Sequence, residues 1–157
     1  MTEVAFYHLK QSPLEAALPK LLEKTLAAGH RAVVMAASVE RVEALNTLLW
    51  TYHPDSWLPH GSARDGSPAE QPIWLTADGE NPNGAKFLFL TDSATSVRVG
   101  EYERLFELFD GNDPSAVKAA RGRWSAYKDA GHRLTYWQQR EGGGWEEKGW
   151  AVVRRPP

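Results

Sequence analysis

The sequence predicts an α/β domain in which a largely parallel or mixed β-sheet is flanked by helices. Short apolar runs rich in β-formers alternate, in the first half, with stretches whose apolar residues recur at helical spacing. The predicted order is strand 3–9, helix 13–28, strand 32–37 and helix 39–50, an alternation typical of parallel sheets. A length of 157 residues fits a single domain with its own core.

The first helix begins with a capping-box pattern. Ser12 is the expected N-cap, Pro13 takes the first helical position, and Glu15 follows three residues after the cap. Pro19 conflicts with this pattern, because a proline inside a helix either kinks it or marks its true beginning, and the sequence leaves both alternatives open. Ser38 is the expected N-cap of the second helix.

The second half begins with a break in the pattern, because residues 50–85 hold half of the chain's ten prolines. A third helix is expected to have Asp113 as N-cap, Pro114 as its first residue and Gly131 as its end. Further strands are expected at residues 72–76, 86–90, 102–109 and 134–139. We expect a domain over residues 1–140, followed by a Gly-rich, mobile tail over residues 141–157.

Composition argues for protein partners over direct DNA binding. The chain has 18 Lys and Arg against 20 Asp and Glu, a net charge of −2, so it lacks the overall basic character of nucleic-acid-binding proteins. It has no cysteine, which excludes disulfides and thiolate sites. No leader-like N-terminus and no membrane-length apolar run is present, so we expect a soluble, cytoplasmic protein that does not associate with membranes.

No pattern of catalytic or metal-binding residues is found. The turn after the first strand, residues 10–13, has no glycine with which to bind a phosphate, and no Rossmann or P-loop motif occurs. The histidines have no metal-ligand spacing, and no serine lies in a Gly-x-Ser-x-Gly context. We therefore expect no catalytic residue, metal or cofactor; an enzyme that uses no recognised motif stays a third alternative.

The third helix is locally basic. Arg121, Trp124 and Lys128 lie at i, i+3 and i+7 and share one side of the helix. Two cations around a flat ring suit single-stranded nucleic acid or an acidic peptide that ends in an aromatic residue. The structural alternative is that Trp124 packs inward and the cations are only a solvated surface.

Four segments, taken in order, resemble the chi subunit family of bacterial DNA polymerase III. They are Phe6–Leu9, the Leu49 to His60 stretch, Asn81–Gly84 and Arg121–His132. The resemblance implies a three-layer α/β/α domain with nucleotide-binding-like topology but no phosphate loop, and a non-catalytic adaptor role. It also implies two partners: the psi subunit, which links chi to the clamp loader, and the acidic C-terminal tail of single-stranded DNA-binding protein, which ends in Pro-Phe.

Matched by position, the resemblance implies a tail-binding pocket formed by Trp50, Arg121 and Trp124. Arg121 would hold the terminal carboxylate while the two tryptophans border the terminal Phe. Arg123 and Lys128 would attract the acidic residues that precede it.

Two further residues follow from the resemblance. Ser125 stands where a familiar member has a basic residue, which removes one charge from the pocket. Trp57 is the expected contact for psi, in the loop over residues 50–60. The alternative function is direct binding of single-stranded nucleic acid by the basic third helix. If the chain is an adaptor, it associates with DNA only through single-stranded DNA-binding protein.

Overall fold

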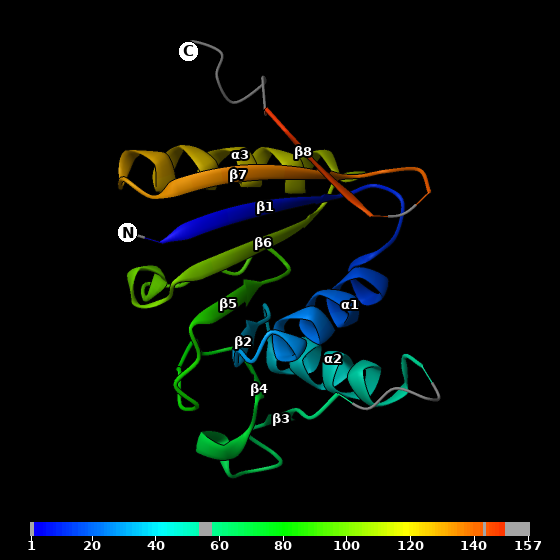
Figure 1. Ribbon diagram of the computed structural model, residues 1–157, viewed down its shortest axis with the longest axis vertical. Coiled ribbons are helices and arrows are strands. Elements are labelled where there is room, and N and C mark those ends of the chain that lie inside the picture. Colours follow the sequence, from blue (N-terminus) through cyan, green and yellow to red (C-terminus); the bar gives the residue numbers. More distant parts are fainter. Residues whose placement is uncertain (1, 54–57, 143, 150–157) are drawn as a thin grey trace.

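The computed structural model describes residues 2–53, 58–142 and 144–149, and Figure 1 shows a sheet with helices on both faces. The helices are α1 (Leu14–Ala27), α2 (Val39–Thr51) and α3 (Pro114–Asp129), with short 3-10 turns at Pro68–Glu70 and Val99–Glu101. The strands are β1 (Glu3–Leu9), β2 (Ala32–Met35), β3 (Gly61–Ser62), β4 (Ile73–Thr76), β5 (Phe87–Leu90), β6 (Arg104–Asp110), β7 (Arg133–Gln139) and β8 (Trp145–Lys148).

The sheet has the strand order β3-β4-β2-β5-β6-β1-β7-β8. All neighbouring strands are parallel except β7 and β8, which pair antiparallel. The predicted fold class, a single α/β domain with a mostly parallel mixed sheet, is confirmed.

Alternate residues of the strands build two separate cores. On β1, Ala5 and Tyr7 join the core beneath α1 and α2, whereas Val4 and Phe6 join the core beneath α3. This alternation follows from the two-residue repeat of a strand, and it makes the buried strands apolar on both sides. Consequently α1 and α2 cover one face of the sheet and α3 covers the other (Figure 1).

The predicted start of the first helix is wrong in its details. The N-cap is Pro13, without a side-chain cap, and α1 begins at Leu14. The hydroxyl of Ser12 instead accepts a hydrogen bond of 2.5 Å from Nε2 of Gln139. Pro19 lies buried inside the helix, so it does not mark the beginning of α1.

The other two helix starts are confirmed. The hydroxyl of Ser38 accepts a hydrogen bond of 3.2 Å from the backbone N–H of Arg41, and the carboxylate of Asp113 accepts one of 3.0 Å from Ser115. Gly131, with φ of +87°, follows the end of α3 in the left-handed conformation that glycine allows.

The structure adds a strand that the sequence analysis did not expect. Residues of β8 fall within the segment assigned to a mobile tail, yet they pair with β7 from Tyr136–Lys148 to Gln139–Trp145. The ring of Trp145 packs edge-on against Tyr7, 4.7 Å between centroids, which fixes the start of this strand on the sheet. The ordered domain therefore extends beyond residue 140; residues 150–157 lie outside the described part of the chain.

Candidate partner-binding surface

The inner side of α3 packs on the sheet through four residues spaced along one stripe. Ala120 is fully buried, and Val117, Trp124 and Tyr127 are partly buried against the same core. Trp124 lies 5.2 Å from the ring of Phe6 on β1, centroid to centroid. The alternative that Trp124 packs inward is therefore correct in part, because its ring contributes to the core.

The exposed part of Trp124 lines a shallow cavity of about 510 Å³ between α3 and the edge of the sheet. Leu134, Thr135 and Tyr136 of β7 form its floor, and Glu147 and Lys148 of β8 contribute one charge of each sign. The cavity is thus aromatic and apolar at its base and polar at its rim, the usual make-up of a site for one anchoring side chain.

Arg121, Ser125 and Lys128 are exposed on α3. Arg121 lies three residues before Trp124 and Lys128 lies four residues after it, so the two cations flank the tryptophan along the helix. The structure therefore keeps together the Arg-Trp-Lys arrangement that the sequence predicts. We refer to Arg121, Trp124, Ser125 and Lys128 as the α3 surface.

Arg123 does not belong to this surface, contrary to the expected role in attracting acidic residues. Its Nε atom lies 3.0 Å from both carboxylate oxygens of Glu107 on β6, and the hydroxyl of Tyr127 donates a 2.8 Å hydrogen bond to the same carboxylate. The side chains of Arg123 and Glu107 are only 12% and 1% exposed. Arg123 therefore neutralises a buried charge, and its cation is not available at the surface.

The surroundings of this ion pair shift two pKa values. Burial raises the pKa of Glu107, and the Arg123 guanidinium and the Tyr127 hydroxyl act against that rise. Burial and the neighbouring carboxylate raise the pKa of Tyr127, so that its hydroxyl keeps its proton and remains a donor. The cluster is a structural contact between α3 and the sheet.

Trp50 does not share a pocket with Trp124, and the predicted composite pocket is wrong on this point. Trp50 lies in the last turn of α2, is 55% exposed, and packs its ring 4.8 Å from that of His60. Because α2 lies on the face of the sheet opposite α3, the two tryptophans cannot border one peptide side chain (Figure 1).

The loop after α2 contains the predicted psi contact. Trp57 lies outside the described residues. The neighbouring His60 is buried, with Nδ1 2.6 Å from the carbonyl oxygen of Leu58 and Nε2 3.2 Å from that of Asn46. His60 therefore fixes the loop through contacts with two backbone carbonyls.

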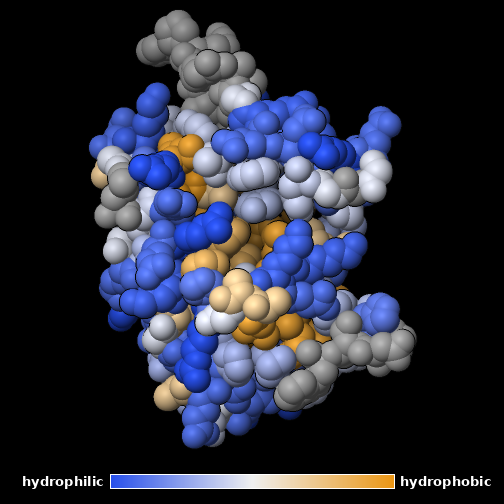
Figure 2. Space-filling view, viewed as in Figure 1, coloured by the Kyte–Doolittle hydropathy of each residue, from blue (hydrophilic) through white to orange (hydrophobic). Residues whose placement is uncertain are grey.

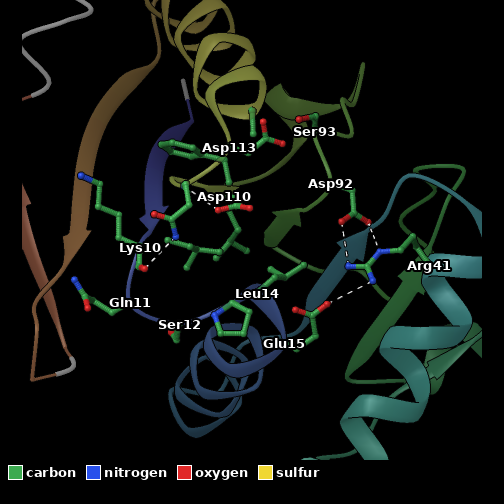
Figure 3. Close-up of a pocket in the computed structure, with 16 residues that line it drawn as sticks. Lys10, Gln11, Ser12, Leu14, Glu15, Arg41, Asp92, Ser93, Asp110 and Asp113 are labelled. Atoms are coloured by element: carbon green, nitrogen blue, oxygen red, sulfur yellow. Dashed lines mark hydrogen bonds and ion pairs between the residues drawn. The ribbon is translucent and has the colours of Figure 1, made fainter.

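A further cleft lies at the carboxyl ends of β1 and β6, where α1 and α3 leave the sheet on opposite faces. Such switch points are the usual ligand sites of open α/β sheets. The cleft measures about 600 Å³, and Figure 3 shows the guanidinium of Arg41 engaged by the carboxylates of Asp92 and Glu15. Arg41 bonds Asp92 at 2.9 and 3.1 Å and contacts Glu15 at 3.5 Å, while Asp113 caps α3.

A side chain occupies the position where related folds bind phosphate. The backbone N–H groups of Lys10, Gln11 and Ser12 donate to Oε1 of Gln139 at 3.0, 2.9 and 3.1 Å. Three convergent amides normally attract an anion, and here an amide oxygen of β7 satisfies them. This internal contact explains in physical terms why a glycine-free turn suffices after β1.

The described residues show neither a metal-ion cluster nor a membrane-spanning helix. Within residues 2–53, 58–142 and 144–149, no three His, Cys, Asp or Glu side chains are grouped so as to hold a metal ion. In the same ranges, no helix has the length and apolar character needed to cross a membrane.

The contribution of β7 and β8 to the Trp124 cavity was missed in the sequence. Only the aromatic and β-branched run at Leu134–Trp137 signalled a strand there, and nothing local placed that strand beside α3. The partner of Arg123 was missed for the same reason, since Glu107 is sixteen residues away along the chain.

Comparison with known proteins shows the family to which this chain belongs. Residues 1–135 match the family described as DNA polymerase III chi subunit, HolC. The chain is 36% identical over 110 residues to a probable DNA polymerase III subunit chi of Rickettsia prowazekii, an alignment that covers 68% of this chain and 67% of the relative. It is 29% identical over 139 residues to DNA polymerase III subunit chi of Pseudomonas aeruginosa, covering 85% and 94%.

The match includes all three helices and every strand from β1 to β6, and it ends within β7. The α3 surface lies inside the matched region, whereas β8 lies beyond it. This chain therefore belongs to the DNA polymerase III chi subunit family, whose members are non-catalytic accessory subunits that serve DNA replication.

Proposed function

We propose that this chain is an adaptor in which the α3 surface binds the acidic C-terminal tail of single-stranded DNA-binding protein. The observation that carries the proposal is the half-buried Trp124, which lines an open cavity and has the exposed cations Arg121 and Lys128 on either side along the helix. A peptide that ends in an aromatic residue offers the matching groups: a ring for the cavity and a terminal carboxylate for a guanidinium.

The proposed binding mode differs from the one expected from the sequence. The terminal Phe enters the cavity between Trp124 and β7, and Arg121 pairs with the terminal carboxylate. Lys128 attracts the acidic residues upstream. Trp50 and Arg123 have no direct part, because one lies on the other face of the sheet and the other is paired with Glu107.

We propose that psi binds at the end of α2, on the opposite side of the molecule. The exposed Trp50 provides a large apolar contact there, at the entrance to the loop that carries Trp57. Large exposed aromatic side chains are common anchors of protein interfaces. Two partners on opposite faces can bind at the same time, as a link between the clamp loader and single-stranded DNA-binding protein requires. This role places the protein in the cytoplasm, where replication takes place.

Titration calorimetry with a peptide of the last nine or so residues of the tail tests the proposal. We expect binding in the micromolar range, which is about −8 kcal/mol. It should be lost when the peptide lacks its terminal Phe or when the protein carries Arg121→Ala. Arg64→Ala is the matched control, since Arg64 is exposed near β3 and pairs only with Glu43 in the described contacts.

Two results would contradict the proposal. One is a folded protein that does not bind the intact peptide. The other is binding that persists in Arg121→Ala. Tight, strongly salt-dependent binding of bare single-stranded DNA to the α3 surface, in place of the peptide, would support the alternative function of direct nucleic-acid binding.

A further inference from the structure

A second cavity, of about 450 Å³, lies on the opposite face of the sheet between α1 and β8. Figure 2 shows this face, with apolar surface across its middle and hydrophilic side chains above and below. Its volume falls within the range of small-ligand sites, about 300–1,000 Å³. We call it the aromatic cavity, and its lining residues are Tyr7, Leu21, Lys24, Thr25, Ala28, His30, Phe87, Arg104, Phe106, Trp137, Gly144 and Trp145.

Stacked rings from several strands form its walls. Tyr7 stacks on Trp137 with 6.1 Å between centroids and an interplanar angle of 12°, and Trp145 meets Tyr7 edge-on. His30 stacks on Phe87 at 4.4 Å and 18°. Trp137, Trp145 and His30 are only partly buried, so each presents surface to a bound molecule.

One wall of the aromatic cavity is formed by residues that lie outside the family match. The match ends at residue 135, whereas Trp145 and Gly144 belong to the turn and strand that follow β7. The site therefore combines matched residues with three residues beyond the match, and it is separate in space from the α3 surface and from the cleft at the ends of β1 and β6.

The charges around the aromatic cavity all favour an anion. Lys24 and Arg104 line it, and no Asp or Glu is among its described lining residues, although the chain as a whole has a net charge of −2. The guanidinium of Arg104 lies 5.1 Å from the ring centre of Phe106 and 5.7 Å from that of Phe87. The rings hold this cation in place without neutralising it.

Arg104 also keeps an unused donor. Its Nε atom is buried and, among the described residues, has no hydrogen-bond partner. A buried donor without an acceptor is unfavourable, and a shift of the guanidinium toward an anionic oxygen would satisfy it. An orphaned guanidinium donor beside partly exposed rings indicates a ligand with a flat ring and a negative group.

We propose that the aromatic cavity binds a nucleotide unit, with its base against Trp137 and Trp145 and its phosphate at Arg104 and Lys24. A nucleotide carries the flat ring and the multivalent anion on one small scaffold, and base stacking together with phosphate pairing is how proteins bind single strands. The same unit can come from a free nucleotide or from single-stranded DNA. The proposal does not depend on tail binding, which uses the other face of the sheet.

Fluorescence anisotropy with a labelled oligodeoxythymidine of about ten nucleotides, and calorimetry with free thymidine 5′-monophosphate, test the proposal on the full chain. We expect Arg104→Gln and Trp145→Ala each to weaken binding by about tenfold, and Lys24→Gln by about threefold. Arg121→Gln and Trp50→Ala are the matched cation and tryptophan controls, and both should leave binding unchanged. Comparable affinity for the two probes indicates a free nucleotide as the ligand, whereas much tighter and salt-dependent binding of the oligonucleotide indicates a DNA strand.

The variants also distinguish a loss of ligand binding from a loss of folding. Lys24 is exposed and Trp145 lies in an edge strand, so these two variants carry the test if thermal melting shows that Arg104→Gln is unfolded. Binding of neither probe at millimolar concentration would overturn the proposal. So would nucleotide binding that is lost in Arg121→Gln but kept in Trp145→Ala and Lys24→Gln, or a cavity that takes an acidic peptide and no nucleotide.

Discussion

The Nε atom of Arg123 lies 3.0 Å from each carboxylate oxygen of Glu107, joining the middle of α3 to the middle of the sheet. Both side chains are almost inaccessible to solvent. The most basic helix of the chain is therefore fastened to its own core by one of its cations, and only the remaining cations are available to partners.

Breaking this ion pair should be strongly destabilising. Arg123→Leu leaves the Glu107 carboxylate buried without its cation, and we expect a loss of about 3–5 kcal/mol in the free energy of unfolding by urea. Without its cation, Glu107 should have a pKa that is raised further in the folded protein. The loss should therefore grow as the pH is raised above 4.5, the ordinary value for Glu, because the unfolded chain then releases this proton whereas the folded protein must keep it or bury a charge. The double variant Arg123→Leu/Glu107→Leu should recover most of the loss; a double variant as unstable as the single one would contradict this account.

Gly111 should tolerate no side chain. A Cβ atom at this position would lie 1.9 Å from Cδ2 of His8 and 2.9 Å from the carbonyl oxygen of Leu9, so the buried ring would have to move. We expect Gly111→Ala to lower the free energy of unfolding by about 1–3 kcal/mol, as overpacking does. Gly122→Ala, on the exposed side of α3 where nothing lies within 4 Å, should instead raise it by about 0.5–1 kcal/mol. Equal effects at the two positions would show that the contact with His8 is unimportant.

His8 should make the fold less stable in mild acid. Burial lowers the pKa of His8, whose Nδ1 lies 2.5 Å from the hydroxyl oxygen of Tyr136. The unfolded chain therefore takes up this proton more readily than the folded one. The contribution of His8 is fully present above about pH 6.5, the ordinary value for His, and is lost as the pH falls below it. Denaturant unfolding at pH 8 and pH 5.5 should show a larger decrease for the wild type than for His8→Asn; parallel decreases would exclude His8 as the cause.

Ser125→Lys should strengthen tail binding. The side chain is exposed one residue after Trp124, so a cation there adds to the attraction for an acidic peptide without changing the fold. We expect a gain of at most about 1 kcal/mol, mainly in the association rate and only at low salt. Stopped-flow association at low and high salt measures it, and an improvement that persists at high salt would argue against a purely electrostatic effect.

Local features of the fold were predictable from the sequence. Ser38 and Asp113 cap their helices with their own side chains, and the apolar runs of β2, β4 and β5 are signals carried within a few residues. The predicted cap at Ser12 failed because its hydroxyl is engaged by Gln139, 127 residues away. A local sequence pattern carries no information about a hydrogen-bonding partner so far away in the chain.

The site was predicted in part, for the same reason. Arg121, Trp124 and Lys128 share a side of one helix, so their arrangement follows from spacing alone. Whether Trp50 joins them depends on which face of the sheet each helix covers, and this follows from the strand order. Arg123 lies three residues after Ala120 and four before Tyr127, on the inner side of the helix, and its partner Glu107 is contributed by a strand elsewhere in the chain.

The central claim is that the α3 surface alone receives the tail peptide, and NMR titration of the tryptophan indole N–H signals tests it most directly. Single Trp→Phe substitutions assign the signals of Trp124 and Trp50, which lie on opposite faces of the sheet. Addition of the tail peptide should shift the Trp124 signal progressively and leave that of Trp50 in place. A shift of Trp50 with no change at Trp124 would contradict the account and move the tail-binding site to the end of α2.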